Sequence, residues 1–73
     1  MDEVRLIYSK FPRKESYYYS FDVVLYNEQY YSGLNLYKNF NNYLAGSPHL
    51  SVMTFTDEND ALNYFNTFVS RDN

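Results

Sequence analysis

The chain has 73 residues, ten of them Tyr and six Phe, with no Cys, one His and a formal net charge of −3. It can bury only one small core, so we expect a single domain over residues 1–73, too short to build most catalytic pockets and therefore not an enzyme. The missing cysteines and the lone histidine exclude a disulfide framework, a Cys/His zinc site and a Cys-His nucleophile pair, so we expect no metal and no cofactor.

The first half of the chain predicts three strands. Residues 4–11 (VRLIYSKF) mix β-branched and aromatic side chains in rough alternation, and a polar loop with a proline ends this strand. Residues 17–26 (YYYSFDVVLY) are the clearest strand. Asn27 and Glu28 then supply a turn, although Asn-Glu is not a favoured two-residue hairpin turn, and residues 29–32 return as a third strand. In the second strand the odd positions are predicted to face the core and the even positions solvent or a partner; the odd positions are Tyr17, Tyr19, Phe21, Val23 and Leu25.

The second half predicts a helix, a strand and a second helix. Asn35 is placed to cap the first helix, which ends at Gly46. Residues 49–56 (HLSVMTFT) alternate as a fourth strand, and Thr56 or Asp57 caps a helix whose acidic first turn is what the helix dipole favours. The predicted fold is α+β in the order β-β-β-α-β-α. It has a small single-layer antiparallel or mixed sheet of three to four strands, with both helices on one face.

Charge and tyrosine content predict a surface that binds protein. Residues 1–14 carry four basic and two acidic side chains, whereas residues 15–73 carry two basic and seven acidic ones. A mostly acidic chain does not suit direct binding to nucleic acid and favours a basic partner. Alternation along the strands leaves some tyrosine surface outside the core. That surface is open to three interpretations: a solvated sheet face, a homodimer interface, or a patch that anchors another protein.

The middle of the chain resembles a known family in the order of its residues. Residues 19–55 contain, in sequence, Asp22-Val23, Leu25, Gln29-Tyr30-Tyr31, Gly33-Leu34, Leu36, Phe40 and Gly46. This order resembles that of the very small phage-encoded inhibitors of uracil-DNA glycosylase. The resemblance implies a dimeric strand-strand-helix-strand protein in which a helix and its dimer mate form an apolar groove for a residue of the enzyme, while acidic groups imitate DNA phosphates.

Carried over to this chain, the resemblance makes Phe40 the aromatic residue of the groove and Tyr43 or Leu44 the apolar position after it. The chain departs from the family at Asn41, where the family has an acidic residue, and it has one extra residue before Phe40. It also adds an amino-terminal strand and a carboxy-terminal helix, which could cover the groove.

We therefore predict a small acidic inhibitor, encoded by a phage or mobile element and acting in the cytoplasm of a bacterial host. It would bind the DNA-contacting cleft of a host DNA-processing protein, of the uracil-DNA glycosylase type or a defence nuclease, and exclude nucleic acid without binding DNA or a membrane itself. The alternative is a homo-oligomeric structural or regulatory protein that associates through exposed tyrosines. The predicted partner-binding residues are Asp22, Glu28, Tyr30, Tyr31, Phe40, Tyr43, Asp57 and Glu58.

Overall fold

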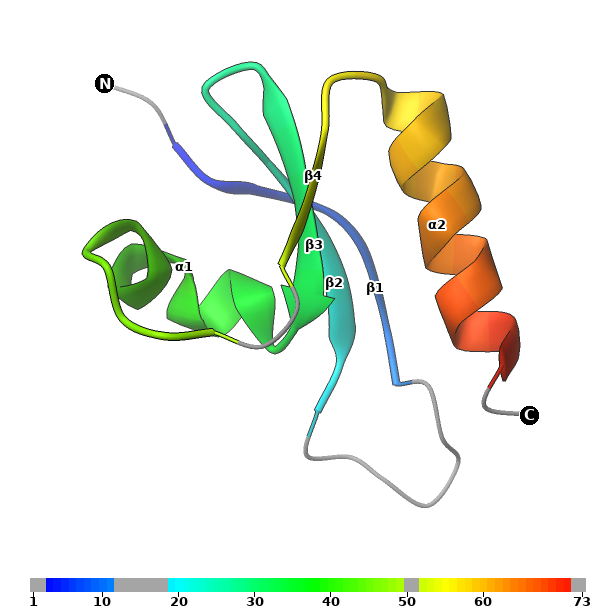
Figure 1. Cartoon of the computed structure of the whole chain (residues 1–73), viewed down its shortest axis with the longest axis horizontal. Coiled ribbons are helices and arrows are strands. Elements are labelled where there is room, and N and C mark those ends of the chain that lie inside the picture. The colour runs from blue at the N-terminus through cyan, green and yellow to red at the C-terminus, as the bar shows by residue number, and fades with distance from the viewer. Residues whose placement is uncertain (1–2, 12–18, 50–51, 72–73) are drawn as a thin grey trace.

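The computed structural model describes residues 3–11, 19–49 and 52–71 (Figure 1). These residues form an α+β fold in the predicted order β-β-β-α-β-α. The elements are β1 (Arg5–Lys10), β2 (Phe21–Tyr26), β3 (Gln29–Leu34), α1 (Leu36–Leu44), β4 (Met53–Phe55) and α2 (Glu58–Arg71).

The four strands form one antiparallel sheet in the order β1-β2-β3-β4, so each strand pairs with its neighbour in the chain. The register of β1 on β2 shifts between Leu6 and Tyr8, which marks a bulge in the edge strand. Two predicted strands were too long. β2 begins at Phe21 rather than at residue 17, and β4 is limited to three residues; positions 17–18 and 50–51 of the predicted strands lie outside the described residues.

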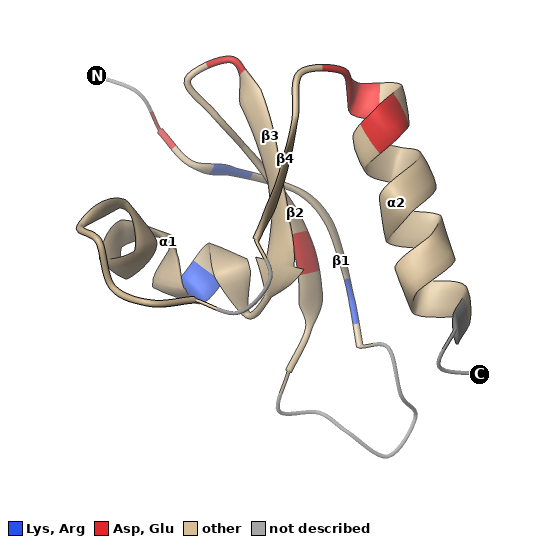
Figure 2. Cartoon of the chain, viewed as in Figure 1, with Lys and Arg blue, Asp and Glu red and all other residues tan. Residues whose placement is uncertain are grey.

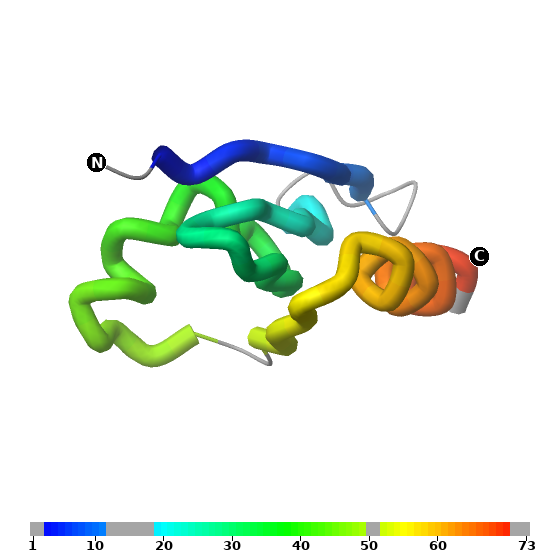
Figure 3. Tube along the Cα trace, turned by 90° about the horizontal axis from the view of Figure 1, so that it is seen from above, coloured from blue at the N-terminus to red at the C-terminus, as the bar shows by residue number. Residues whose placement is uncertain are grey.

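The prediction that both helices lie on one face of the sheet is wrong. Phe21 and Val23 of β2 pack with α2 in a core that also contains Ala61, Phe65 and Val69. Val24, on the other side of the same strand, packs with the buried Leu36 and Phe40 of α1. Figures 1 and 3 show the two helices on opposite sides of the sheet. The molecule therefore has three layers and two small cores, because β2 is buried on both faces.

This arrangement corrects the interpretation of the tyrosines. No solvated sheet face exists along β2, because α1 covers the side that was predicted to be open. The rings of Tyr26 and Tyr31 lie 5.4 and 5.1 Å from that of Phe40, on the α1 side. Tyr19, which was predicted to be in the core, is 58% exposed.

The turn between β2 and β3 has the left-handed backbone that tight hairpins use. Asn27 has φ +51° and Glu28 has φ +64°, and Tyr26 pairs with Gln29 on either side of them. Two central residues with positive φ match the twist of the strands, so the geometry overcomes a residue pair that is unfavourable in sequence. Asn tolerates this conformation, whereas Glu is strained in it by about 1 kcal/mol.

Replacing Glu28 by Gly is therefore expected to stabilise the protein by about 1 kcal/mol, since glycine adopts positive φ freely. Urea unfolding followed by circular dichroism measures the change. Glu28→Ala is the matched control, because it removes the same carboxylate but keeps a Cβ. If alanine stabilised the protein as much as glycine does, the gain would come from charge and not from the backbone.

The two ends of α1 differ in how closely they follow the prediction. At the carboxyl end, Gly46 has φ +98°, its N–H donates to Tyr43 O, and the N–H of Ser47 donates to Asn42 O, as predicted for a glycine terminator. At the amino end, Asn35 occupies the cap position but its side chain does not cap the helix. Its Oδ1 accepts instead from the N–H of Ser20.

Candidate functional site

Exposed carboxylates gather at one end of the molecule. Glu28 is in the β2–β3 turn, and Phe55 at the end of β4 pairs with Tyr30 beside that turn. The chain leaving β4 therefore starts α2 at the same end of the sheet, as Figure 2 shows. We call this surface the acidic end; it consists of the exposed residues Glu28, Asp57, Glu58 and Asp60.

Two tyrosine hydroxyls hold Glu58 in place within the acidic end. Tyr8 of β1 donates to Oε2 at 3.1 Å and Tyr30 of β3 donates to Oε1 at 3.2 Å. The hydrogen bond to Glu58 raises the pKa of Tyr8, and partial burial followed by the bond to Glu58 raises the pKa of Tyr30. One carboxylate thus joins the start of α2 to two strands that are not neighbours in the sheet.

This cluster predicts a loss of stability at alkaline pH. The folded state raises the pKa of both tyrosines above the usual 10.0, so it is stabilised while their hydroxyls remain protonated. This contribution to the free energy of unfolding is complete below about pH 10 and is lost as the pH rises further. Glu58→Gln is expected to reduce this loss in thermal unfolding between about pH 9 and 11. Asp60→Asn, in the same helical turn, should keep the wild-type dependence; an equal reduction in both variants would contradict the assignment to Glu58.

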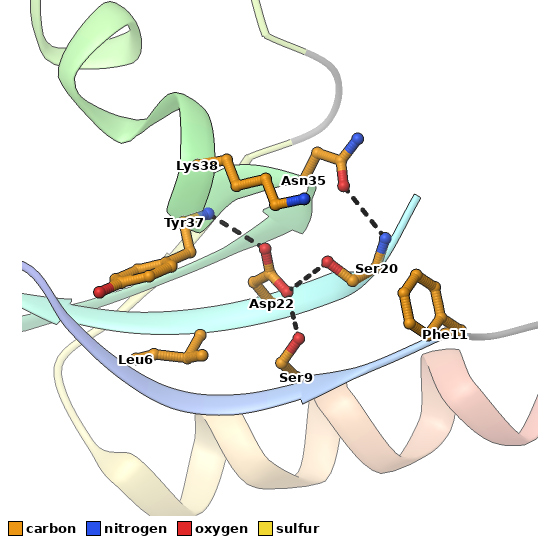
Figure 4. A pocket seen from close by; sticks show the side chains of 8 residues that line it. All are labelled: Leu6, Ser9, Phe11, Ser20, Asp22, Asn35, Tyr37 and Lys38. Atoms are coloured by element: carbon orange, nitrogen blue, oxygen red, sulfur yellow. Dashed lines mark hydrogen bonds between the residues drawn. The ribbon is translucent and has the colours of Figure 1, made fainter. Parts of the chain in front are cut away.

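Asp22 lies elsewhere and is 2% exposed. Its Oδ1 accepts from the hydroxyls of Ser9 at 2.6 Å and Ser20 at 2.8 Å, and its Oδ2 accepts from the N–H of Tyr37 at 3.0 Å (Figure 4). The carboxylate therefore ties β1 and β2 to the first turn of α1. Above it is a hollow of about 210 Å³, lined by Leu6, Ser9, Phe11, Ser20, Asp22, Asn35, Tyr37 and Lys38.

A second hollow of about 360 Å³ lies at the other side of the start of α1. It is lined by Tyr19, Leu34, Asn35, Asn39, Pro48 and His49. His49 is half-buried: its Nε2 lies 2.7 Å from Leu34 O and its ring meets Tyr43 edge-on. Its role here is to fasten the segment after α1 to the end of β3.

The structure divides the predicted partner-binding residues into two groups. Glu28, Asp57, Glu58 and the half-buried Tyr30 lie together at the acidic end. The other four are on the α1 side, where Asp22 and Phe40 are buried and Tyr31 and Tyr43 are half-buried against Phe40. Asp22 and Phe40 present no surface to a partner while α1 stays in place.

Sequence reasoning missed Asp60, a member of the acidic end, and Tyr8, which donates to Glu58 within it. Asp60 was interpreted only as part of a helix start, although a single carboxylate can both favour a helix dipole and face a partner. Tyr8 was assigned to the first strand, but its hydrogen bond joins residues 50 positions apart and depends on the register of β1 on β2. Alternation along that strand did not reveal its direction, because the bulge between Leu6 and Tyr8 places the adjacent Ile7 and Tyr8 against the same core.

Comparisons with protein-family models, curated proteins and solved structures find no match to this chain. Among the described residues, no helix has both the length and the apolar character that crossing a membrane requires. Within residues 3–11, 19–49 and 52–71, no three His, Cys, Asp or Glu side chains lie close enough together to hold a metal ion.

Proposed function

We propose that the protein is a small inhibitor that binds the basic, DNA-contacting cleft of a DNA-processing protein through its acidic end and so excludes nucleic acid. The observation that carries this proposal is the gathering of Glu28, Asp57, Glu58 and Asp60 at one end, all exposed. Carboxylates grouped in this way attract a basic surface at long range and speed association with it.

Two of the basic residues lie away from the acidic end, whereas Arg5 pairs with Leu25, close to the Glu28 turn. Lys10 pairs with Phe21, at the end of β2 that is far from the Glu28 turn. Lys38 lines the hollow beside Asp22 and is likewise remote from the turn. The acidic end is therefore not neutralised by these two lysines.

The structure limits which part of the resemblance to glycosylase inhibitors supports the proposal. In that family the helix aromatic belongs to an open groove, whereas Phe40 here is 1% exposed and covered by Tyr26 and Tyr31. The support comes from the acidic groups and not from an apolar groove. The half-buried Tyr8 and Tyr30, both fixed against Glu58, are aromatic side chains placed to contact a partner beside the carboxylates.

The test is affinity capture of the tagged protein's partners from a nuclease-treated bacterial lysate, with increasing salt in the wash and mass spectrometry of what remains bound. A parallel assay titrates the protein into a uracil-excision reaction of purified bacterial uracil-DNA glycosylase. Retention of a nucleic-acid enzyme that is lost as salt rises, or inhibition of uracil excision, would support the proposal. Recovery of the bait alone together with undisturbed excision would count against it.

Exposed apolar side chains favour self-association as a second candidate function. Leu6, Phe11 and Tyr37 are each 44% exposed and all line the hollow above Asp22, next to β1, which is an edge strand of the described sheet. A second copy could cover them, which would enlarge a thin core. Light scattering of the purified protein over a concentration series distinguishes the two functions. Self-association requires an oligomer to form in the absence of any other protein.

A further inference from the structure

The two helices are anchored to the sheet very differently. α2 packs across β2, β3 and β4, and its core holds five buried residues: Phe21, Val23, Ala61, Phe65 and Val69. α1 packs mainly on β2, and its core holds three: Val24, Leu36 and Phe40. The sheet separates the two cores, and they share no buried residue.

α1 also has little intrinsic stability. It has only nine residues, and six of them are poor helix formers: the asparagines Asn39, Asn41 and Asn42 and the aromatic residues Tyr37, Phe40 and Tyr43. It has no acidic residue in its first turn, no basic residue in its last turn, and no side-chain cap from Asn35. Isolated helices shorter than about 12 residues are marginal in water, so α1 depends on groups outside itself.

Asp22 supplies the missing cap from a neighbouring strand. Its Oδ2 accepts from the N–H of Tyr37, the second residue of the helix, and a carboxylate there also favours the helix dipole. Ser9 and Ser20 hold the other oxygen in position. The N–H of Asn35 donates to Ser20 O at 2.7 Å, which ties the chain just before the helix to the same place.

We propose that α1 detaches from the sheet as a separate unit while the α2 half stays folded, and that Asp22 is the latch that sets how often this happens. Detachment breaks the bond between Asp22 and Tyr37 and exposes Val24, Leu36 and Phe40, an apolar surface that the closed form hides. Proteins commonly open in such contiguous units, each with its own free energy. The inference does not depend on the proposed inhibitor function.

Amide hydrogen exchange of the wild-type protein, read residue by residue by NMR, is the first test. The amides of α1 are expected to exchange at least about tenfold faster than those of α2, through an opening that responds weakly to low concentrations of urea. The amides of α2 and β2 should exchange through an opening that responds strongly. A single opening free energy and a single urea dependence for both helices would overturn the proposal.

The second test changes the latch. Asp22→Ala is expected to speed exchange in α1 by about tenfold relative to α2. Asp22→Asn should largely restore the wild-type ratio, because its amide oxygen still accepts from Tyr37 and its amide nitrogen can donate to the serine hydroxyls. Glu3→Gln, which removes an exposed carboxylate outside both helices, should leave the ratio unchanged.

Equal acceleration of both helices by Asp22→Ala would show that Asp22 stabilises the whole molecule and is not a latch. If that variant does not fold, the double variant Ser9→Ala, Ser20→Ala takes its place, because it releases Oδ1 without creating a gap at position 22. The same ratio of exchange rates then decides the result.

Discussion

Phe21→Ala is expected to bring the protein to the edge of unfolding. Phe21 is 1% exposed, and its ring stacks on that of Phe68 at 4.0 Å with an interplanar angle of 11°. The rings of Tyr64 and Phe65 lie 5.9 Å away. Truncating a buried Phe costs about 3–5 kcal/mol, whereas a domain of this size has a total stability of roughly 4–11 kcal/mol.

Urea unfolding followed by circular dichroism measures this loss. The matched control is Tyr19→Ala, which truncates a ring that is 58% exposed two residues earlier in the chain and should cost less than about 1 kcal/mol. Similar losses in the two variants would contradict the assignment of Phe21 to the centre of the α2 core.

Neutralising the acidic end is expected to slow association with the target about tenfold or more at low salt. The variant carries Glu28→Gln, Asp57→Asn and Asp60→Asn, which bring the formal net charge from −3 to 0 while keeping the shape of each side chain. Glu58 is left unchanged because it holds Tyr8 and Tyr30. Surface plasmon resonance against the captured partner, repeated at rising salt, gives the two rate constants.

A control variant separates local charge from net charge. Asn41→Lys, Asn42→Lys and Asn66→Lys add three positive charges at exposed positions of the two helices, outside the acidic end, and give the same net charge of 0. Association of this control should slow much less than that of the neutralised variant. Equal rate constants for the wild-type protein and the neutralised variant would rule out the acidic end as the binding surface.

The fold could be predicted from sequence in its element order but not in its layers. Strong local signals, such as the apolar run of β2 and the glycine after α1, placed the elements. The two-sided burial of β2 was missed because Asp22 and Tyr26 make its even positions look polar. Val23 and Val24 are adjacent and both 0% exposed, and a pair of adjacent apolar residues of this kind is the mark of a strand covered on both sides.

The candidate site could be predicted from sequence only where the charge of a side chain is enough to place it on the surface. Glu28, Asp57 and Glu58 are exposed, as expected for carboxylates in a turn and at a helix start. Asp22 was assigned to the outward face by alternation along its strand, and it is buried instead because its carboxylate finds three donors. Two of those donors come from other elements of the fold, so no local pattern could reveal them.

Burial of a carboxylate within β2 also guards the hairpin against mispairing. Every side chain of a strand changes sides when the strand pairs one residue out of step. Such a slip of β2 would turn Asp22 towards Ala61, Phe65 and Val69, where an unpaired charge is very costly, and would remove Phe21 from the same core. A strand that is apolar on both faces and lacks this charge would tolerate pairing one residue out of register. Asp22, which interrupts the apolar pattern of β2, therefore makes the register of β2 unique.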